Sequence, residues 1–192
     1  MGYALAAAAH DRRASVVLVT GPTSLAEPAG VETVRVTTAA EMHQEVVARA
    51  ATVDVVIMAA AVADYAPVSV ASQKIHKHED SLTVKFERTP DIIGELGRRR
   101  GDDERPVLVA FAAETEHLLE QAKTKLREKR VDLVVANDVS RKDAGFEADS
   151  NEVTLVSHQG EELIPLQSKI AVAGRVLDRI ESLLAARTPA HK

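Results

Sequence analysis

The stretch from Val55 to Tyr65 constrains the fold of this chain more than any other segment. It begins as the apolar run Val-Val-Ile-Met, continues through the small residues 59–63, and ends on the single carboxylate of Asp64. An apolar run without polar alternation favours a strand buried on both faces of a parallel sheet. Ligands of such sheets bind beyond the carboxyl ends of the strands, where alanines leave room and a carboxylate can accept an amino group. A buried strand followed by an ordinary turn is the alternative interpretation.

The composition is that of one soluble domain built mainly from aliphatic residues. The chain has 192 residues, of which 45% are hydrophobic and 28% charged, and a length like this supports a sizeable core. Because only 3% of the residues are aromatic, the core must consist of Val, Leu, Ile and Ala, which favours parallel strands covered by helices. We expect a single domain over residues 1–187, followed by a disordered tail at 188–192.

Charge and cysteine content exclude several classes of function. A formal net charge of -5 argues against nucleic-acid binding through the whole surface. The absence of cysteine rules out disulfides, zinc–thiolate sites and a cysteine nucleophile. No apolar run approaches the ~20 residues that span a bilayer, and the N-terminus lacks a signal-peptide pattern. We therefore expect a cytoplasmic protein that binds neither nucleic acid nor membranes.

Predicted strands and helices alternate along almost the whole chain. We expect strands at residues 15–20, 33–37, 54–61, 81–87, 107–112, 132–136 and 152–157. We expect helices at residues 1–13, around 42–50, from Pro90 onward, at 115–130 and along 170–184. The irregular polar stretch from 66 to 80 is too long for a simple connection and is a candidate functional loop. This order predicts an α/β fold with a Rossmann-like, doubly wound, mostly parallel sheet flanked by helices.

The beginning of the chain does not match the usual start of such a fold. A doubly wound nucleotide-binding unit starts with a central strand and a phosphate-binding turn, whereas this chain starts with a helix. The sheet therefore apparently lacks its first strand, and the strand at 15–20 is predicted to have no central partner. The sequence also contains neither G-x-G-x-x-G nor G-x-x-x-x-G-K-[ST], which weakens the interpretation as a classical dinucleotide enzyme.

Polar side chains follow small residues at three predicted strand ends. They are Asp64, Glu114 after Phe111, and Asn137. A cleft along one edge of the sheet would explain all three, although turns and caps explain each one separately. The helix start at Pro90 to Ile93 offers free N–H groups to ligand oxygens.

Two groups of basic residues are candidates for binding an anion. Lys125 and Lys129 are four residues apart and share one face of a predicted helix. Residues 74–78 put Lys-Ile-His-Lys-His on the long loop, where cations suit phosphate or carboxylate groups. Solvated surface lysines are the alternative in both places. A metal site made of His76, His78 and Glu79 is poorly supported, because these alternating ligands have no distant partner.

Together, these segments resemble the phosphopantothenoylcysteine synthetase domain of bacterial coenzyme A biosynthesis. The resemblance runs from Met1 to about Leu184 and is carried by Ala59–Tyr65, Lys74–Lys77, Thr89–Ile92, Phe111–Thr115, Ala136–Ser140 and Phe146–Asn151. It implies a cytoplasmic homodimer that joins 4′-phosphopantothenate to L-cysteine using CTP and Mg²⁺. The implied reaction passes through an acyl-cytidylate and gives 4′-phosphopantothenoylcysteine, pyrophosphate and CMP.

The resemblance also assigns residues. Lys74 would be catalytic, Ala61 and Asn137 would contact the substrate, and the metal ligands are unknown. The CTP pocket would comprise Met58, Ala59, Ala60, Asp64, Lys74, Pro90, Asp91, Ile92, Ile93, Phe111, Lys125 and Lys129.

The chain departs from the family pattern at its start. The strand and phosphate-binding loop that precede the first helix in the family have no counterpart here, and a flavin-dependent decarboxylase is often encoded upstream. His76 replaces a residue that is more often lysine. We therefore expect the chain as it stands to bind CTP weakly or not at all and to ligate poorly.

Two alternatives remain open. One is an NAD(P)-dependent oxidoreductase of the short-chain type, which needs a glycine fingerprint and usually Tyr-x-x-x-Lys; here Ser69 stands four positions after Tyr65. The other is a non-catalytic, truncated remnant that only pairs with a partner.

Overall fold

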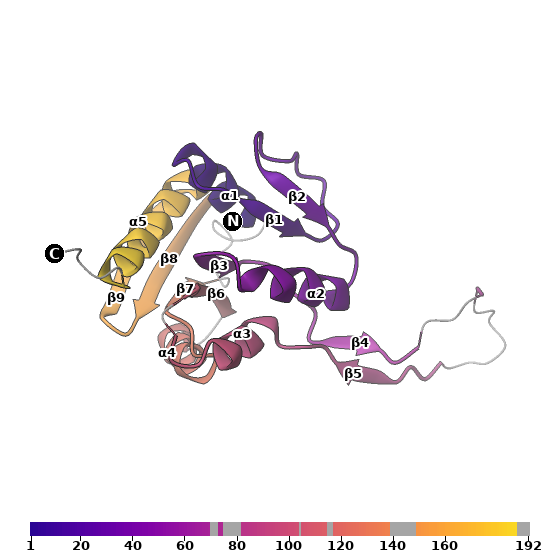
Figure 1. The fold of residues 1–192 in the computed structure, drawn as a ribbon. Coiled ribbons are helices and arrows are strands. Elements are labelled where there is room, and N and C mark those ends of the chain that lie inside the picture. The colour runs from indigo at the N-terminus through magenta and orange to yellow at the C-terminus, as the bar shows by residue number, and fades with distance from the viewer. Residues whose placement is uncertain (70–72, 75–81, 104, 115–116, 139–148, 188–192) are drawn as a thin grey trace.

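A computed structural model describes residues 1–69, 73–74, 82–103, 105–114, 117–138 and 149–187 (Figure 1). The helices are α1 Gly2–Asp11, α2 Ala39–Ala50, α3 Ile92–Arg100, α4 Leu118–Glu128 and α5 Lys169–Arg187. The strands are β1 Val17–Thr20, β2 Glu32–Arg35, β3 Val55–Met58, β4 Tyr65–Pro67, β5 Phe86–Arg88, β6 Val107–Glu114, β7 Leu133–Asp138, β8 Ser150–Ser157 and β9 Gly160–Ser168. The predicted α/β class is confirmed. None of the helices described here is long and apolar enough to cross a membrane.

The main sheet has five strands in the order β3-β6-β7-β8-β9. The first three run parallel, whereas β8 and β9 join as antiparallel strands. Side chains of β6 and β7 that point to one face meet α1 and α5, and those on the other face meet α2, α3 and α4. Val107, Val109, Leu133 and Val135 are each 0% exposed, as expected for apolar runs covered on both faces.

A second, smaller sheet consists of β1 and β2 alone, paired in parallel. It shares a core cluster with α2 and with the end of β3, in which Val19 and Val34 pack near Met42 and Met58. Among the residues that the structure describes, β1 has no strand partner besides β2. The expectation that this strand lacks a central neighbour is therefore confirmed for the described part of the chain.

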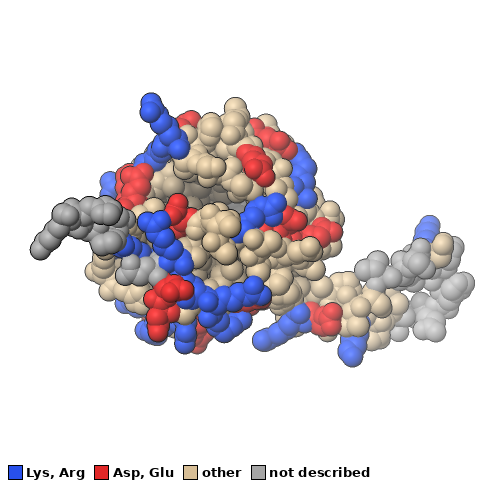
Figure 2. Space-filling view, in the orientation of Figure 1, with Lys and Arg blue, Asp and Glu red and all other residues tan. Residues whose placement is uncertain are grey.

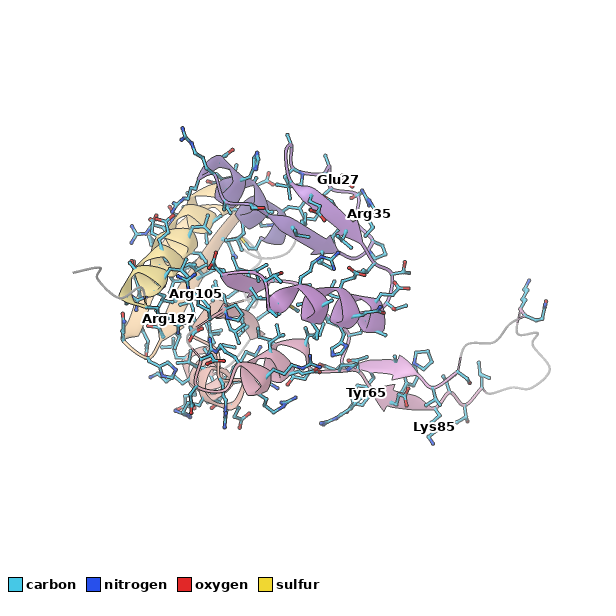
Figure 3. All side chains as sticks on the ribbon, viewed as in Figure 1. Glu27, Arg35, Tyr65, Lys85, Arg105 and Arg187 are labelled. Atoms are coloured by element: carbon cyan, nitrogen blue, oxygen red, sulfur yellow. The ribbon has the colours of Figure 1, made fainter. Side chains whose placement is uncertain are left out.

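An antiparallel ribbon of β4 and β5 projects from the body as an arm (Figure 1). The predicted loop at 66–80 therefore begins as a strand. Of the strand predicted at 81–87, the observed strand covers Phe86 and Glu87 and extends to Arg88. Residues 70–72 and 75–81 lie outside the described residues. Figure 3 shows Tyr65 and Lys85 on this arm, away from the five-stranded sheet. We call residues 65–69 and 82–88 the arm.

The sequence analysis missed β9. Only Ile164 of this strand is buried at its centre, and polar or exposed residues surround it. Its sequence therefore lacks the apolar signal that identified the other strands. The hairpin from β8 turns at His158 and Gln159, and Gly160 (φ 129°) adopts a conformation that residues with side chains rarely adopt. The predicted tail at 188–192 lies outside the described residues.

A buried ion cluster ties three elements together at the amino end of β7. Asp132 is 6% exposed and accepts hydrogen bonds from the Leu108 N–H at 2.7 Å and from Arg187 Nη2 at 2.5 Å. Arg100 also pairs with Asp132 and donates to the Arg130 carbonyl at 2.8 Å. The cluster fixes the end of α3 and the end of α5 to the sheet, and no sequence pattern predicted it.

Candidate nucleotide site at the carboxyl ends of the strands

Small side chains line the carboxyl end of β3. Met58 pairs with Ala110 of β6, and the chain leaves the sheet at Ala59. Met58 and Ala59 are half-buried, whereas Ala60 and Ala61 are exposed. Because β6 continues beyond the end of β3, this edge of the sheet forms a step with little side-chain bulk. A flat ligand can approach the backbone closely at such a step.

Two hydrogen bonds hold Asp64 beside the start of α3. The Thr89 N–H donates to the Asp64 carbonyl at 3.0 Å, and Thr89 Oγ1 donates to the Ala63 carbonyl at 2.6 Å. Pro90 follows directly, and Asp91 is the N-cap of α3. The prediction that Pro90 occupies the first helical turn is therefore wrong, because the helix begins one residue after the aspartate cap. Asp64 and Pro90 are both exposed beside this cap.

Asp91 joins the start of α3 to the end of α4. Its Oδ1 accepts from the Gly94 N–H at 3.2 Å, and its Oδ2 lies 2.6 Å from Lys129 Nζ. Burial alone would raise the pKa of Asp91, but the Lys129 ammonium, the Gly94 N–H and the nearby Arg98 outweigh it, so the pKa is lowered. The carboxylate is therefore ionised at neutral pH and holds Lys129 in place.

The next two residues of α3 have different roles from those predicted. Ile92 is 4% exposed and Ile93 is half-buried, and both pack in the core. Their side chains are thus not available to a ligand, and only the backbone N–H groups of this first helical turn are suited to bind one.

Lys125 reaches the same step in the sheet from α4. Its Nζ donates to the Phe111 carbonyl at 3.0 Å. Phe111 lies one residue beyond Ala110, the partner of the last residue of β3, so its carbonyl opens onto the step. The Phe111 side chain is half-buried against the core that contains α1 and α5. The Phe111 side chain thus belongs to the core rather than to a ligand pocket, and its backbone is what faces the site.

A glycine allows α4 to end this close to α3. A Cβ built on Gly97 would lie 1.9 Å from the Lys129 carbonyl oxygen, which is backbone and cannot move aside cheaply. The predicted helix at 115–130 is observed as α4, with Lys129 as its C-cap and residues 115–116 outside the described residues. Lys125 and Lys129 therefore lie one turn apart, and their ammonium groups bond to the Phe111 carbonyl and to Asp91 respectively.

Asn137 stands at the carboxyl end of β7, opposite Ala113 of β6. Its Oδ1 is buried and has no hydrogen-bond partner among the described residues. Buried polar atoms in native proteins normally have a partner, so this acceptor suits a ligand that brings an N–H or O–H group. The remainder of that predicted motif, residues 139–140, lies outside the described residues, as does Thr115 of the preceding one.

No contact joins Lys74 to the other predicted residues in the described part of the chain. The segment 73–74 is drawn at the far end of the arm, away from the five-stranded sheet (Figure 1). Lys74 is exposed. Ile75, His76, Lys77, His78 and Glu79 lie outside the described residues, so the metal alternative there is not tested.

Arg88 is a cation close to Asp64 that was not among the predicted site residues. It pairs with Tyr65 across the two strands of the arm. A hydrogen bond with Tyr65, together with the nearby negative charge of Asp64, raises the pKa of Arg88. The position of Arg88 directly before Thr89 and Pro90, at a predicted helix start, is the signal that could have identified it.

A chain of contacts connects most of the predicted residues into one region, which we call the rim. The end of β3 meets β6, Phe111 meets Lys125, Lys129 meets Asp91, and Thr89 meets Asp64. The rim consists of Ala59, Ala60, Asp64, Asp91, Phe111, Lys125 and Lys129. It combines two ammonium groups, a helix start and small side chains, a combination that suits a phosphate ester carrying a flat ring.

No group of three His, Asp or Glu side chains that could hold a metal gathers in the described ranges. A Mg²⁺ ion that accompanies a nucleotide is bound mostly by phosphates and water, with only one or two carboxylates. Asp91 of the rim fits such a limited role, since it is ionised.

Comparison with known proteins gives consistent matches over nearly the whole chain. The sequence profile of the family described as "DNA/pantothenate metabolism flavoprotein C-terminal domain" matches residues 1–184. The coenzyme A biosynthesis bifunctional protein CoaBC of Vibrio vulnificus is 42% identical over 186 residues, covering 96% of this chain and 46% of the relative. The chain thus spans about half the length of the curated relatives it matches.

Solved structures agree in fold. The C-terminal domain of a CoaBC protein superposes with a TM-score of 0.79 at 38% identity, covering 96% of this chain and 82% of that one. A mutant of Cab2 in complex with phosphopantothenate-cysteine superposes with a TM-score of 0.63 at 19% identity, covering 81% and 55% of the two chains. At 19% identity, the similarity to the Cab2 structure shows only a shared fold.

Proposed function

The chain belongs to the DNA/pantothenate metabolism flavoprotein C-terminal domain family, and we propose that its rim binds CTP for the ligation of 4′-phosphopantothenate with L-cysteine. The full-length relatives carry coenzyme A biosynthesis in their names, which supports this pathway for the chain. The observation that carries the proposal is a pair of contacts: Lys125 donates to the Phe111 carbonyl just beyond the end of β3, and Lys129 pairs with Asp91 at the start of α3.

The rim residues divide into two roles. The exposed alanines and the Asp64 carboxylate would hold the cytosine, because a carboxylate accepts the exocyclic amino group. Lys125 and Lys129 would neutralise the phosphates. Both lysines are already paired within the protein, at 3.0 Å and 2.6 Å, so nucleotide phosphates would replace a carbonyl for Lys125 and share the ammonium of Lys129 with Asp91. Because the phosphates must compete with these protein partners for the two lysines, CTP is expected to bind weakly.

The reaction balances without a protein nucleophile. A carboxylate oxygen of 4′-phosphopantothenate attacks the α-phosphorus of CTP, the α–β anhydride bond breaks, and pyrophosphate leaves. The amine of cysteine then attacks the acyl carbon of the acyl-cytidylate, the acyl–oxygen bond breaks, CMP leaves, and the amine proton passes to solvent. Cations fixed near the phosphates stabilise the charge that builds during the first step more than they stabilise the bound substrates. Mg²⁺ would supply further charge neutralisation on the triphosphate.

Asn137 and Ala61 are the proposed substrate contacts. The unpaired Asn137 Oδ1 at the end of β7 would accept a hydrogen bond from an amide or hydroxyl of phosphopantothenate or from the cysteine amine. Ala61 is exposed and follows the alanines that end β3, so it would face the same space.

Lys74 is the proposed catalytic cation, and we propose that it serves the rim of a second copy. Residues 73–74 are drawn beyond the far end of the arm, away from the five-stranded sheet (Figure 1). The arm exposes large apolar side chains that a homodimer would cover, namely Tyr65 54%, Val68 46%, Leu82 65%, Val84 46% and Phe86 55% exposed. A flavin-dependent decarboxylase encoded upstream is the further proposed partner.

The test is a ligation assay that follows pyrophosphate release from CTP in the presence of 4′-phosphopantothenate and L-cysteine. It uses this chain and a version extended at its N-terminus by the strand and phosphate-binding loop of the family. We expect poor turnover by the chain, robust turnover by the extended version, and loss of turnover with Lys74→Gln. Near-normal turnover by Lys74→Gln would remove that residue from the mechanism. NADPH binding without CTP binding would favour the oxidoreductase alternative.

Mixing inactive variants tests whether Lys74 acts across a dimer. Extended Lys74→Gln and extended Lys129→Ala are each expected to be inactive. In a mixed dimer one rim is intact and receives an intact Lys74 from the other chain, so mixing should restore part of the activity. If mixing restores nothing while light scattering shows exchanging dimers, Lys74 acts within its own chain. A stable dimer without any CTP-dependent reaction would favour the remnant alternative.

A further inference from the structure

Asn137 lies on the opposite face of the five-stranded sheet from the two rim lysines. In β7, Val135 packs in the cluster with α1 and α5, whereas Ala136 packs in the cluster with α3 and α4. Because side chains alternate along a strand, Asn137 shares the face of Val135. Lys125 and Lys129 belong to α4 and its C-cap, on the face of Ala136. Figure 2 shows Lys and Arg side chains gathered along the lower part of the body, where Figure 1 places α3 and α4.

The surroundings of Asn137 leave room for a ligand on its own face. Its direct partner on β6 is Ala113, which is exposed and has little bulk. Asn137 itself is only half-buried, although its Oδ1 is buried and has no partner among the described residues. The last torsion of an asparagine side chain is broad and roughly two-fold. A rotation of the amide therefore brings Oδ1 to the open side next to Ala113.

A second asparagine on the same face is satisfied by the protein. Asn151 of β8 is 1% exposed and lies two residues from Val153, the direct partner of Asn137. The Asn151 Oδ1 accepts from the Glu152 N–H at 3.2 Å. Buried acceptors in native proteins normally have such a bond. The open acceptor of Asn137 is thus particular to this position at the carboxyl end of β7.

The chemistry of the acceptor restricts the group that it can bind. An amide oxygen does not bond to a phosphate or a carboxylate, since both are acceptors at neutral pH, so the ligand must bring an N–H or an O–H. Among the reacting groups of the proposed ligation, the carboxylate of 4′-phosphopantothenate and the α-phosphate of CTP carry no such hydrogen. The amine of L-cysteine does.

We propose that Asn137 Oδ1 holds the amine of L-cysteine for its attack on the acyl-cytidylate, from the α1 and α5 face of the sheet. The inference rests on the proposed function and narrows the Asn137 contact to one substrate. The phosphates would lie with Lys125 and Lys129 on the other face, so the incoming amine and the leaving CMP occupy opposite sides of the sheet edge.

The acceptor also suits the charge that develops in this step. The amine nitrogen forms a bond to the acyl carbon and becomes positively charged, the acyl–oxygen bond breaks, and CMP leaves with the bonding electrons. The proton on nitrogen then passes to solvent. A fixed carbonyl dipole next to that nitrogen stabilises the positive charge more in the transition state than in the bound substrate.

The stability of the chain as it stands tests whether the acceptor is open. Asn137→Leu removes an unpaired buried acceptor, so the thermal midpoint should stay unchanged or rise. The matched control is Asn151→Leu, which removes a bonded acceptor on the same face and should lower the midpoint. If Asn137→Leu lowers the midpoint as far as Asn151→Leu does, Oδ1 has a structural partner and the proposal is wrong.

Separating the two half-reactions tests the ligand, with the extended version of the ligation assay. Without cysteine, Asn137→Leu should release pyrophosphate from CTP and 4′-phosphopantothenate in one turnover as fast as the unsubstituted protein. The cysteine-dependent release of CMP should fall about 100-fold, the usual loss when one such hydrogen bond is removed. The KM for L-cysteine should rise while the KM for CTP stays the same.

Asn137→Asp supplies a readout that a purely structural role would not move. It keeps an acceptor but adds a negative charge, which favours the protonated form of the amine. The cysteine step should therefore persist in this variant and shift to higher pH, while the pyrophosphate step keeps its pH profile.

Two results would overturn the inference alone. One is an equal loss of both half-reactions in Asn137→Leu, which would assign the residue to the nucleotide or to 4′-phosphopantothenate. The other is an unchanged cysteine step in that variant. If the unsubstituted extended version releases no pyrophosphate from CTP, the proposed function itself fails, and the cysteine contact fails with it.

Discussion

The five-stranded sheet and the β1–β2 sheet contain strands of similar composition but bury them very differently. β1 reads Val-Leu-Val-Thr and β7 begins Leu-Val-Val-Ala, yet Val17 is 37% exposed and Leu133 is 0% exposed. The difference lies in the neighbours: β7 has a strand on each side and helices on both faces, whereas β1 has one strand partner in the described structure. Apolar composition therefore predicts a strand, while the number of neighbours determines how much that strand stabilises the fold.

Within the five-stranded sheet, charged groups show a similar contrast between buried and exposed positions. Asp132 and Arg100 form an ion pair with side chains 7% and 9% exposed, whereas Asp54 and Arg105 form one with side chains 66% and 50% exposed. Removing one partner of a buried pair leaves an uncompensated charge, but an exposed pair is readily replaced by water. Buried positions should consequently respond far more strongly to substitution than exposed ones.

The largest effect should follow Asp132→Ala. This change leaves Arg100 and Arg187 without their carboxylate, which costs about 3–5 kcal/mol for a broken buried pair. The matched control is Asp54→Ala, where loss of an exposed pair costs about 0–1 kcal/mol. Urea unfolding of both variants measures the difference, and equal losses would show that the cluster does not anchor the sheet.

Leu133→Ala is expected to cost about 2–5 kcal/mol, because it leaves a cavity in the middle of the core. Leu18→Ala in β1 is the comparison. Because the Leu18 side chain is only half-buried, its truncation should lower the free energy of unfolding clearly less. The two free energies of unfolding, measured by denaturant titration, test whether neighbours rather than composition set stability. A Leu18→Ala loss as large as that of Leu133→Ala would contradict the contrast between the sheets.

Gly97→Ala should cost about 1–3 kcal/mol, the usual penalty of overpacking, because the added methyl meets the Lys129 backbone. It should also weaken CTP binding by displacing the end of α4. Gly101→Ala is a less informative control because of its positive φ, so Gly21→Ala, which meets nothing within 4 Å, is preferred. An unchanged thermal midpoint in Gly97→Ala would show that the two helices can separate freely.

The smallest effect concerns pH. The pKa of Asp91 is lower in the folded protein, so its contribution is full above the ordinary carboxyl pKa of about 3.9 and is lost as pH falls through the lower folded value. The stability difference between the wild type and Asp91→Asn should therefore shrink with acidification. Its size at neutral pH is about 0–1 kcal/mol, because the Asp91 side chain is 40% exposed. A difference that grows below the ordinary pKa would reverse the assigned sign.

The sequence predicted the features that depend on local pattern. The apolar runs at Val55–Met58 and Leu133–Ala136 identified strands, and the pattern at 115–130 identified the helix that carries Lys125. The order of strands and helices was enough to predict the α/β class, because this alternation leaves few packing solutions.

The features that sequence did not predict depend on distant contacts. β9 has little apolar signal and is held by its ladder with β8, while the Asp132 cluster joins residues far apart in the chain. The partners of Asp91 and the orphaned acceptor of Asn137 are likewise visible only after folding. The predicted grouping of Lys74 with the rim stays a prediction. Residues 73–74 are drawn away from the five-stranded sheet, so a contact with the rim would need a second copy of the chain.

The most direct test of the account is an NMR titration of the chain with CTP that follows individual backbone amides. The account predicts weak, saturable shifts concentrated at Ala59, Phe111 and Gly94, and their loss when Lys125→Ala and Lys129→Ala are combined. Shifts confined to other surfaces, or shifts at the rim with NADPH but not with CTP, would contradict the assignment of the rim as a site for a pyrimidine triphosphate.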